Sequence, residues 1–323
     1  MKHVIFGGSG FIGKHLNKYL SILNIDNKNV VNYDLTGSQG DFKYVDIRSP
    51  IRELLPDSTA NIIYNLAGIH KTPGHSDNEY LETNIRGAEN ICAFASDNGI
   101  DTIVYTSSIS VYGSSEDEKD ETSLPMPNTP YGISKLTAEY IHKLWQSEKP
   151  DTRKLIIVRP GVVFGKLEGG NFTRLYASMK KGFFFYPGRK DTIKACVYVK
   201  DVVRILHDAA KDETPGVVTY NLSYYPAPTI ERICKSIAAM TGVKEPKILV
   251  HGGLLKTAAG SMYYAGRILG KKINGIHPDR VKKLMVSTNI SGEKLKASSY
   301  KLNFTLDEAI KDWYQDCGNK ELY

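Results

Sequence analysis

The sequence lacks a long apolar run: nothing in its 323 residues approaches the roughly 18 consecutive apolar residues that a membrane-spanning helix requires. Its first residues already have the character of a strand and a glycine turn, which leaves no room for a signal peptide. We therefore expect a cytoplasmic protein without a stable membrane span. An amphipathic segment from Leu254 to Leu269 leaves open whether one surface touches a membrane.

Cysteine is scarce and unpatterned. The four residues Cys92, Cys196, Cys234 and Cys317 have no C-x-x-C spacing. This excludes a disulfide framework and the common zinc and redox motifs, and it favours reduced, mostly structural thiols. No metal site is predicted.

The chain also lacks a basic stripe interleaved with aromatic residues, although 42 Lys and Arg against 35 Asp and Glu give it a formal charge of +7. We therefore expect no nucleic-acid partner. A lysine-rich solvated surface accounts for most of the charge, which is also compatible with an anionic ligand. No internal repeat is present, and the length allows one large domain or two closely joined ones.

What the chain does have is a glycine turn at its beginning. The apolar run from Lys2 to Phe6 leads into Gly7-Gly8-Ser9-Gly10-Phe11-Ile12-Gly13, and apolar residues at helical spacing follow. A strand that runs through glycines into a helix is typical of a dinucleotide site, whose phosphates lie at the helix N-terminus. The alternative is an ordinary tight turn, because the spacing is G-x-x-G-x-x-G and glycines alone are a weak signal.

Two acids follow this turn. Asp34 ends a second strand about twenty residues past the last glycine, where a carboxylate meets the adenosine ribose, and no arginine stands beside it to hold a 2′-phosphate. We therefore expect NAD in preference to NADP. Asp46 ends a third strand, predicted over 42–48, and either accepts a hydrogen bond from adenine or caps a helix before Pro50.

Strands and helices alternate up to about residue 165, which predicts an α/β fold with a doubly wound parallel sheet of the Rossmann type. The acidic stretch from Ser114 to Glu121 is interpreted as a solvated loop. Segments Val197–Val199 and Val217–Leu222 are predicted to return to the main sheet. We therefore assign residues 1–165 and about 195–222 to an NAD-binding domain, and 166–194 with 223–323 to a smaller C-terminal α/β substrate-binding domain.

Tyr131 and Lys135 are four residues apart and so share one helix face. A tyrosine becomes a base near neutral pH only when its anion is stabilised, and a lysine one turn away can do this. An ordinary surface pair is the usual meaning of Y-x-x-x-K. The serine-rich strand end at Ser107-Ser108 and the glycine turn favour the catalytic reading here.

Taken together, the chain resembles an extended short-chain dehydrogenase/reductase of the NAD-dependent nucleotide-sugar epimerase/dehydratase family. The resemblance covers roughly the first 220 residues. It is carried by Gly7 to Gly13, Asp34, Asp46-Ile47, Asn65-Leu66-Ala67-Gly68, Asn84 with Gly87 and Asn90, Ser107 to Gly113, Tyr131 to Lys135, Arg159 to Gly165, and Tyr198-Val199-Lys200-Asp201.

The resemblance implies that Ser108, Tyr131 and Lys135 are catalytic, with Tyr131 as the base and Lys135 holding the ribose. It places Asn84 and Ser107 beside the nicotinamide. The remaining cofactor-binding positions that it implies are Gly7, Gly10, Phe11, Ile12, Gly13, Asp34, Asp46, Ile47, Leu66, Ala67 and Gly68.

Several positions depart from the patterns of particular subfamilies. Ile109 and Ser110 stand where sugar dehydratases and decarboxylases carry an acid, so those reactions are not expected. Val162 replaces an asparagine of the UDP-galactose epimerases, and Lys194 replaces an arginine that binds the substrate diphosphate. The resemblance also implies substrate contacts from Asn171 and Arg280.

The function that follows is an NAD-dependent epimerase acting at C4 of a nucleoside-diphosphate sugar through a 4-keto intermediate. A nucleotide-4-keto-sugar reductase uses the same three catalytic residues and stays open, and a steroid-type dehydrogenase is more distant. A non-catalytic dinucleotide-binding protein would be free to lose Tyr131 or Lys135. Similar proteins pair two helices across a two-fold axis, so we also expect a homodimer, through helices near 79–98 and 131–147.

Overall fold

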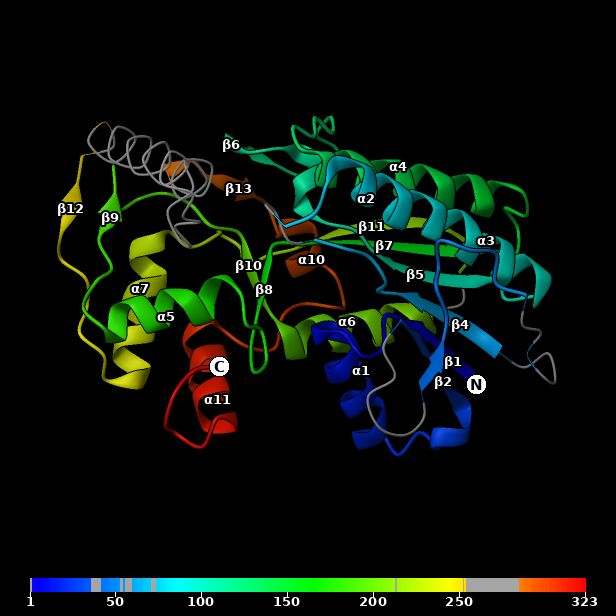
Figure 1. Cartoon of the computed structure of the whole chain (residues 1–323), viewed down its shortest axis with the longest axis horizontal. Coiled ribbons are helices and arrows are strands. Elements are labelled where there is room, and N and C mark those ends of the chain that lie inside the picture. The colour runs from blue at the N-terminus through cyan, green and yellow to red at the C-terminus, as the bar shows by residue number, and fades with distance from the viewer. Residues whose placement is uncertain are drawn as a thin grey trace, which may run out of the picture.

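A computed structural model of the chain (Figure 1) describes residues 2–35, 42–52, 55, 60–70, 74–212, 214–251, 253 and 285–323. Arg280 and the segment Leu254 to Leu269, both named above, lie outside the described residues. Among the described helices, none combines the length and the apolar character needed to cross a bilayer.

The centre of the molecule is a seven-stranded sheet whose paired strands are all parallel. Its order is β11-β7-β5-β4-β1-β2-β3, so the chain extends the sheet in one direction from β1 and in the other from β4. In such sheets the ligand lies at the carboxyl ends of the strands where this direction reverses. The strands are β1 (Lys2–Phe6), β2 (Val30–Asp34), β3 (Phe42–Tyr44), β4 (Ala60–Asn65), β5 (Thr102–Thr106), β7 (Lys154–Pro160) and β11 (Gly216–Leu222).

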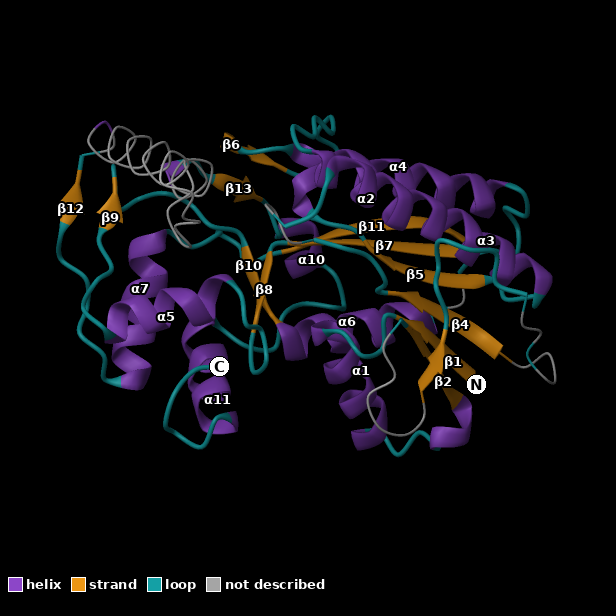
Figure 2. Cartoon of the chain, in the orientation of Figure 1, coloured by secondary structure: helices purple, strands orange, loops and turns teal. Residues whose placement is uncertain are grey.

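Helices cover both faces of this sheet (Figure 2). On one face, α1 (Phe11–Ile22) and α6 (Val199–Lys211) pack with the sheet into one apolar core. On the other face a core forms from α3 (Gly87–Asp97) and α4 (Pro130–Ser147). A short helix, α2 (Asp77–Leu81), and a π-helical turn, η2 (Glu82–Arg86), lead into α3 without a break. The doubly wound parallel sheet predicted from the sequence is confirmed.

The second half of the chain builds a further core of its own, around Phe164, Tyr198, Ile233 and Trp313. Three two-stranded sheets accompany it, each of them parallel. The remaining elements of the described chain are η1 (Asn27–Asn29), η3 (Ile109–Tyr112), β6 (Ser115–Lys119), β8 (Val162–Phe164), α5 (Asn171–Lys180), β9 (Tyr186–Pro187), β10 (Cys196–Tyr198), α7 (Ile230–Thr241), β12 (Leu249–Val250), β13 (Thr288–Ile290), α10 (Glu293–Ala297) and α11 (Leu306–Asp316).

Three sequence predictions about elements are wrong. The strand expected at Val197–Val199 is β10, which pairs with β8 and not with the main sheet, because Tyr198 packs into the second core. The third strand ends at Tyr44, so Asp46 lies in a turn. The acidic stretch contains β6, which pairs with β13 some 170 residues later in the chain.

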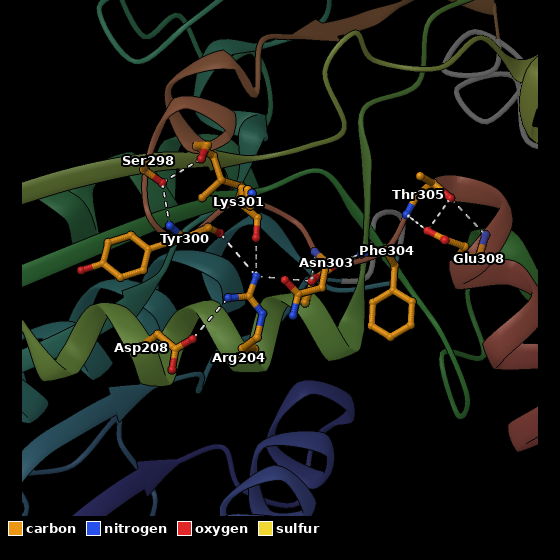
Figure 3. A network of polar contacts seen from close by, with 11 residues as sticks. Arg204, Asp208, Ser298, Tyr300, Lys301, Asn303, Phe304, Thr305 and Glu308 are labelled. Carbon is orange, nitrogen blue, oxygen red and sulfur yellow. Dashed lines mark hydrogen bonds and ion pairs between the residues drawn. The ribbon is translucent and has the colours of Figure 1, made fainter.

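The C-terminal part of the chain is fastened to α6 by a polar network (Figure 3). The buried Asp201 carboxylate accepts hydrogen bonds from the backbone N–H groups of Asn303 (2.8 Å) and Phe304 (3.3 Å). Arg204, one turn later, donates to the carbonyl oxygen of Lys301 at 2.5 Å. The chain then enters α11 through a capping box, in which Thr305 and Glu308 satisfy each other's backbone N–H groups.

Candidate active site

The glycine turn lies at the carboxyl end of β1, where the sheet reverses direction. Gly7 has φ of +84°, and a Cβ there would lie 2.8 Å from the Ala67 nitrogen and 2.9 Å from the Leu66 carbonyl carbon. A Cβ on Gly13 would lie 2.3 Å from the Gly7 oxygen. Only glycine permits either approach. Gly10 precedes α1, whose N-terminus has no side-chain cap, so its first N–H groups are available to an anion.

Asp34 is held against this turn by Ser9. Its Oδ2 accepts hydrogen bonds from the Ser9 backbone N–H (3.0 Å) and from the Ser9 hydroxyl (2.6 Å), and its Oδ1 accepts from the Leu35 N–H (2.7 Å). Sequence reasoning missed Ser9 as the partner that orients this carboxylate. The sequence feature that could have indicated this role is the position of Ser9 within the glycine turn.

Asp46 and Ile47 lie beyond the third strand. Asp46 accepts from the Arg48 backbone N–H at 3.0 Å and pairs with the Arg48 guanidinium at 2.6 Å. The hydrogen bonds from Arg48 lower the pKa of the Asp46 carboxyl. The backbone contact caps a turn over residues 46–49 and not the helix given above as the alternative, and an adenine contact stays a prediction. Ile47 is buried against α3, where a Cβ on Gly87 would lie 2.4 Å from its terminal methyl group.

The end of β4 and the π-helical turn meet at Gly68, Asn84 and Lys135. A Cβ on Gly68 would lie 2.7 Å from Asn84 Oδ1 and 3.7 Å from Lys135 Nζ. Asn84 Nδ2 also donates to the Ser134 hydroxyl at 2.9 Å, and its Oδ1 accepts from the Ile69 N–H at 3.0 Å. Single π-helical turns are frequent at functional sites, because they re-aim one side chain of a helix. Here the turn brings a buried amide to the predicted nicotinamide region.

Tyr131 is the second residue of α4, with Thr129 as the N-cap. Burial raises the pKa of the Tyr131 hydroxyl, and the nearby Ser108 hydroxyl acts in the opposite direction. Ser108 itself caps η3, accepting from the Ser110 N–H at 3.1 Å. The structure therefore places two of the three predicted catalytic residues close enough to influence each other.

Lys135 is almost fully buried one turn after Tyr131. Its Nζ donates to the Thr106 carbonyl oxygen at 2.7 Å and lies 4.7 Å above the centre of the Tyr105 ring. Burial lowers the pKa of Lys135 to about 8, and the negative charge of Glu139 counteracts part of this effect. The lysine is therefore mostly protonated near neutral pH, as a cation that stabilises a tyrosinate must be.

A buried ionic network beneath these residues was not predicted. Glu139, fully buried one turn after Lys135, accepts from Arg159 Nε at 2.8 Å and from its terminal nitrogen at 2.6 Å. It also accepts from the Ser107 hydroxyl at 2.5 Å. Arg159 in turn donates to the Tyr112 hydroxyl, which donates to Asn221 Oδ1 on β11. The Ser107 hydroxyl is thus engaged by Glu139. The predicted contact of Ser107 with the nicotinamide stays a prediction.

The substrate-side residues lie in the second half of the chain. Asn171 is the exposed first residue of α5, and its Oδ1 accepts from Arg174 at 3.1 Å. Lys194 precedes β10, and its Nζ donates to the Val286 carbonyl oxygen at 2.7 Å. Burial lowers the pKa of Lys194 to about 8, while the nearby Glu116 raises it. An incoming phosphate would favour the charged form further.

These residues fit a dinucleotide. The glycine turn provides a surface without side chains beside an uncapped helix N-terminus, and Asp34 is fixed at the end of the adjacent strand. Gly68 keeps open the approach to Asn84 and Lys135. Among the described residues, no group of acids, histidines and cysteines could hold a metal ion, and all four cysteines are buried and free.

A parallel sheet with a glycine turn at its switch point and a Tyr-x-x-x-Lys helix facing a serine defines a dinucleotide-dependent oxidoreductase-type enzyme of the short-chain dehydrogenase/reductase class. The sequence profile of the NAD dependent epimerase/dehydratase family matches residues 3–223. The chain belongs to this family. The prediction of the family, and with it of NAD as the cofactor, is confirmed.

Individual relatives give finer comparisons. The chain is 26% identical over 311 residues to the N-acetyl-alpha-D-glucosaminyl-diphospho-ditrans,octacis-undecaprenol 4-epimerase of Escherichia coli O157:H7, covering 95% of this chain and 92% of that protein. It is 23% identical to the GDP-6-deoxy-D-talose 4-dehydrogenase of Aggregatibacter actinomycetemcomitans, covering 77% of this chain and 85% of that protein. The fold matches the UDP-glucuronic acid 4-epimerase of Bacillus cereus in complex with NAD, with a TM-score of 0.69 and 18% identity over 98% of this chain and 99% of that one.

Proposed function

We propose that this chain is an NAD-dependent sugar 4-epimerase that acts on a diphosphate-linked sugar. The observation that carries the proposal is the placement of Tyr131 one turn before the buried Lys135 on α4, with the Ser108 hydroxyl near enough to lower the pKa of Tyr131. The family membership and the 4-epimerase among the relatives support it.

In the proposed reaction Tyr131 removes the proton from the C4 hydroxyl, while Ser108 donates a hydrogen bond to the same oxygen. Held at the glycine turn and Asp34, NAD would supply the hydride acceptor and donor for C4, with no net oxidation of the sugar. Lys135 stabilises the tyrosinate, and Tyr131 gives its proton back to the oxygen at the end. Ile109 and Ser110 carry no acid that could drive a dehydration.

The diphosphate is the part of the substrate that the family's epimerases share with the lipid-linked substrate named for the E. coli relative. We place it against Lys194, with Asn171 and Arg280 as further contacts. Residues 166–194 and 223–323 then serve as the substrate-binding domain, and residues 1–165 with 195–222 as the NAD-binding domain, with Phe164 and Tyr198 of the latter completing the core of the former. The group that carries the sugar in this substrate is a nucleoside diphosphate or a polyprenyl diphosphate.

Lys194→Ala tests the placement of the phosphates. Loss of a charge-assisted hydrogen bond should weaken substrate binding by about 1.5–3 kcal/mol, measured as KM, and leave NAD affinity nearly unchanged. Lys181→Ala, at an exposed position after α5, serves as the matched control. A variant that loses NAD affinity but keeps its KM would place Lys194 in the other half of the site.

A 4-keto-sugar reductase is the second candidate, favoured by the similarity to a GDP-sugar 4-dehydrogenase. Such an enzyme exchanges its cofactor at each turnover, whereas an epimerase regenerates it. One experiment separates the two candidates. The purified protein is incubated with UDP-N-acetylglucosamine or with the corresponding undecaprenyl-diphosphate sugar, and the product is followed by NMR.

Formation of the C4 epimer without net change in NADH absorbance supports the epimerase. Absence of the epimer, together with stoichiometric consumption of NADH in a parallel incubation with NADH and a nucleotide-4-keto sugar, supports the reductase. If neither substrate nor cofactor is consumed while NAD binds, a non-catalytic dinucleotide-binding protein is indicated.

We also propose a homodimer that forms through α4. Its outer face presents an exposed stripe of Ile133, Tyr140 and Leu144, beside Leu81 of α2. The stripe lies on the helix pair that the sequence predicted for the interface. The cytoplasmic location and the absence of a nucleic-acid partner stay predictions.

A further inference from the structure

Four consecutive aromatic residues after α5 alternate between the inside and the outside of the second core. The helix ends at Lys180, and Gly182 with φ of +71° turns the chain, so that Phe183 projects with 76% of its surface exposed. Phe184 then packs edge-on against the fully buried Tyr186 at 5.6 Å. Phe185, between them, is 37% exposed. Two of the four rings complete the core, and the other two have no place in it.

The neighbouring strand adds two more exposed apolar residues. β12 pairs in parallel with β9, in a register that places Leu249 opposite Tyr186, and Tyr186 N–H donates to the Ile248 carbonyl oxygen at 2.8 Å. This register puts Ile248 beside Phe185, on the face away from the Tyr186 ring. Ile248 is 63% exposed and Leu249 is also exposed. Leu249, opposite Tyr186, lies on the other face of the strand pair. We call Phe183, Phe185 and Ile248 the apolar tip.

The segments of the apolar tip carry more cations than acids, and three of these cations, Lys180, Arg189 and Lys190, form ion pairs with the acids Glu321, Glu116 and Glu231 elsewhere in the chain. The two segments that form it, 180–190 and 243–250, contain Glu245 as their single acid against six cations, which are Lys180, Lys181, Arg189, Lys190, Lys244 and Lys247. Lys181, Lys244 and Lys247 are exposed and form no ion pair with a described residue. Both strands of the tip lie at the end of the molecule far from the N-terminus (Figure 1).

We propose that the apolar tip docks on an anionic lipid bilayer. Aromatic and aliphatic side chains that enter the interfacial region, ringed by lysines that meet anionic headgroups, form the usual surface of a protein that lies on a membrane without crossing it. The lysine excess favours a negatively charged surface over a neutral one. The role that we give to this docking rests on the proposed function. Docking would bring the active site to sugars that are linked through a diphosphate to a membrane lipid.

Sedimentation with vesicles tests the proposal without any substrate. The whole protein is mixed with phosphatidylcholine vesicles, with or without phosphatidylglycerol. The wild type should bind the anionic vesicles and bind the neutral ones much more weakly. Phe183→Ser/Phe185→Ser should weaken binding by at least about tenfold, and Lys244→Ala/Lys247→Ala by about fivefold per lysine. Leu124→Ser/Met126→Ser, at two equally exposed apolar positions elsewhere, should bind like the wild type.

The proposal is overturned if the wild type stays in the supernatant with anionic vesicles, or if the double Phe variant binds as well as the wild type. The proposal is also overturned if the protein does not bind vesicles and instead binds a protein partner through Phe183. Thermal unfolding of each variant checks its folding. Turnover of a water-soluble nucleotide sugar should be unchanged in the double Phe variant. A failed epimerase assay would therefore leave the vesicle result standing, and a failed vesicle assay would leave the epimerase standing.

Discussion

Tyr131 is the residue on which the proposed chemistry depends most directly. Tyr131→Phe removes only the hydroxyl that exchanges the proton, and proton transfer by a positioned group contributes roughly 10²–10⁴-fold to a rate. We expect turnover to fall by about this factor, measured by NMR detection of the C4 epimer. NAD affinity, measured by calorimetry, should stay close to that of the wild type.

Tyr140→Phe, on the exposed face of the same helix, is the matched control and should keep full turnover. If Tyr131→Phe turned over at the wild-type rate, Tyr131 would have no part in the mechanism.

Glu139 shows what a single buried charge does beneath the site. Glu139→Gln keeps the shape of the side chain but leaves the Arg159 guanidinium, itself nearly fully buried, without its counter-charge. Breaking a buried ion pair on one side costs about 3–5 kcal/mol, and we expect the free energy of unfolding in urea to fall by that amount. Asp117→Asn, on the exposed side of β6, should leave it unchanged.

The Glu139→Gln variant should also have a shifted pH profile. As the pH is raised above neutrality, its activity should begin to fall at a lower pH than that of the wild type. Glu139 raises the pKa of Lys135 against the effect of burial, so without its charge the lysine loses its proton earlier. A variant with wild-type stability and an unshifted pH profile would contradict both expectations.

Residues that share a short stretch of sequence were predictable, and residues joined by the fold were not. Gly7 to Gly13 act within one turn, so their spacing alone indicated their role. Glu139 stands at helical spacing from Lys135, yet its partners come from the ends of β5 and β7. Nothing in the linear sequence states that these strands are neighbours in the sheet.

Helix α4 links the active site to the proposed assembly. One face carries Tyr131, Lys135 and Glu139, and the outer face carries the exposed stripe with Tyr140 and Leu144. Tyr140→Glu/Leu144→Glu would bring like charges together across a two-fold axis, where each substitution occurs twice. We expect the wild type to have the mass of a dimer and this variant the mass of a monomer, measured by light scattering at micromolar concentration.

Ile22→Glu, at an exposed position on α1, is the control for this pair and should stay a dimer. A wild-type mass of one chain would contradict the proposed interface.

The elements of the first half were predicted well, because hydrophobic alternation and helix signals are local. The misplaced elements all depend on a distant partner. β6 consists of acidic residues with little preference for strands, and it forms because β13 and the Arg189 side chain meet it. The apolar sequence of β10 is typical of a strand in the main sheet, but packing in the second core determines its position.

At the scale of the whole molecule, stability should depend on buried histidines. His142 donates from Nδ1 to the Ala138 carbonyl oxygen (2.6 Å), and its Nε2 accepts from Asn65 (3.1 Å), so the ring is neutral. Burial lowers the pKa of His142 to about 4. Between pH 6.5 and 4 the unfolded chain therefore binds a proton that the folded chain does not, and stability falls as the pH falls.

For His142 alone this amounts to about 2 kcal/mol between pH 7 and pH 5. Urea unfolding at the two values measures it, and His142→Gln should remove this share of the difference. His3, whose pKa burial also lowers to about 4, should keep part of the pH dependence in that variant. Equal stability of the wild type at both values would contradict the expectation.

The order of strands in the central sheet has a consequence for synthesis of the protein. β7, all of whose residues are buried, pairs on one side with β5 and on the other with β11, over seven residue pairs. Once the first 165 residues have emerged from the ribosome, every part of the proposed catalytic centre has been made. One side of β7 still lacks its neighbouring strand at that stage. An open apolar strand is a template for aggregation. The nascent chain stays in that condition while α5, β9 and β10 are made, until residue 222 emerges and β11 closes the sheet.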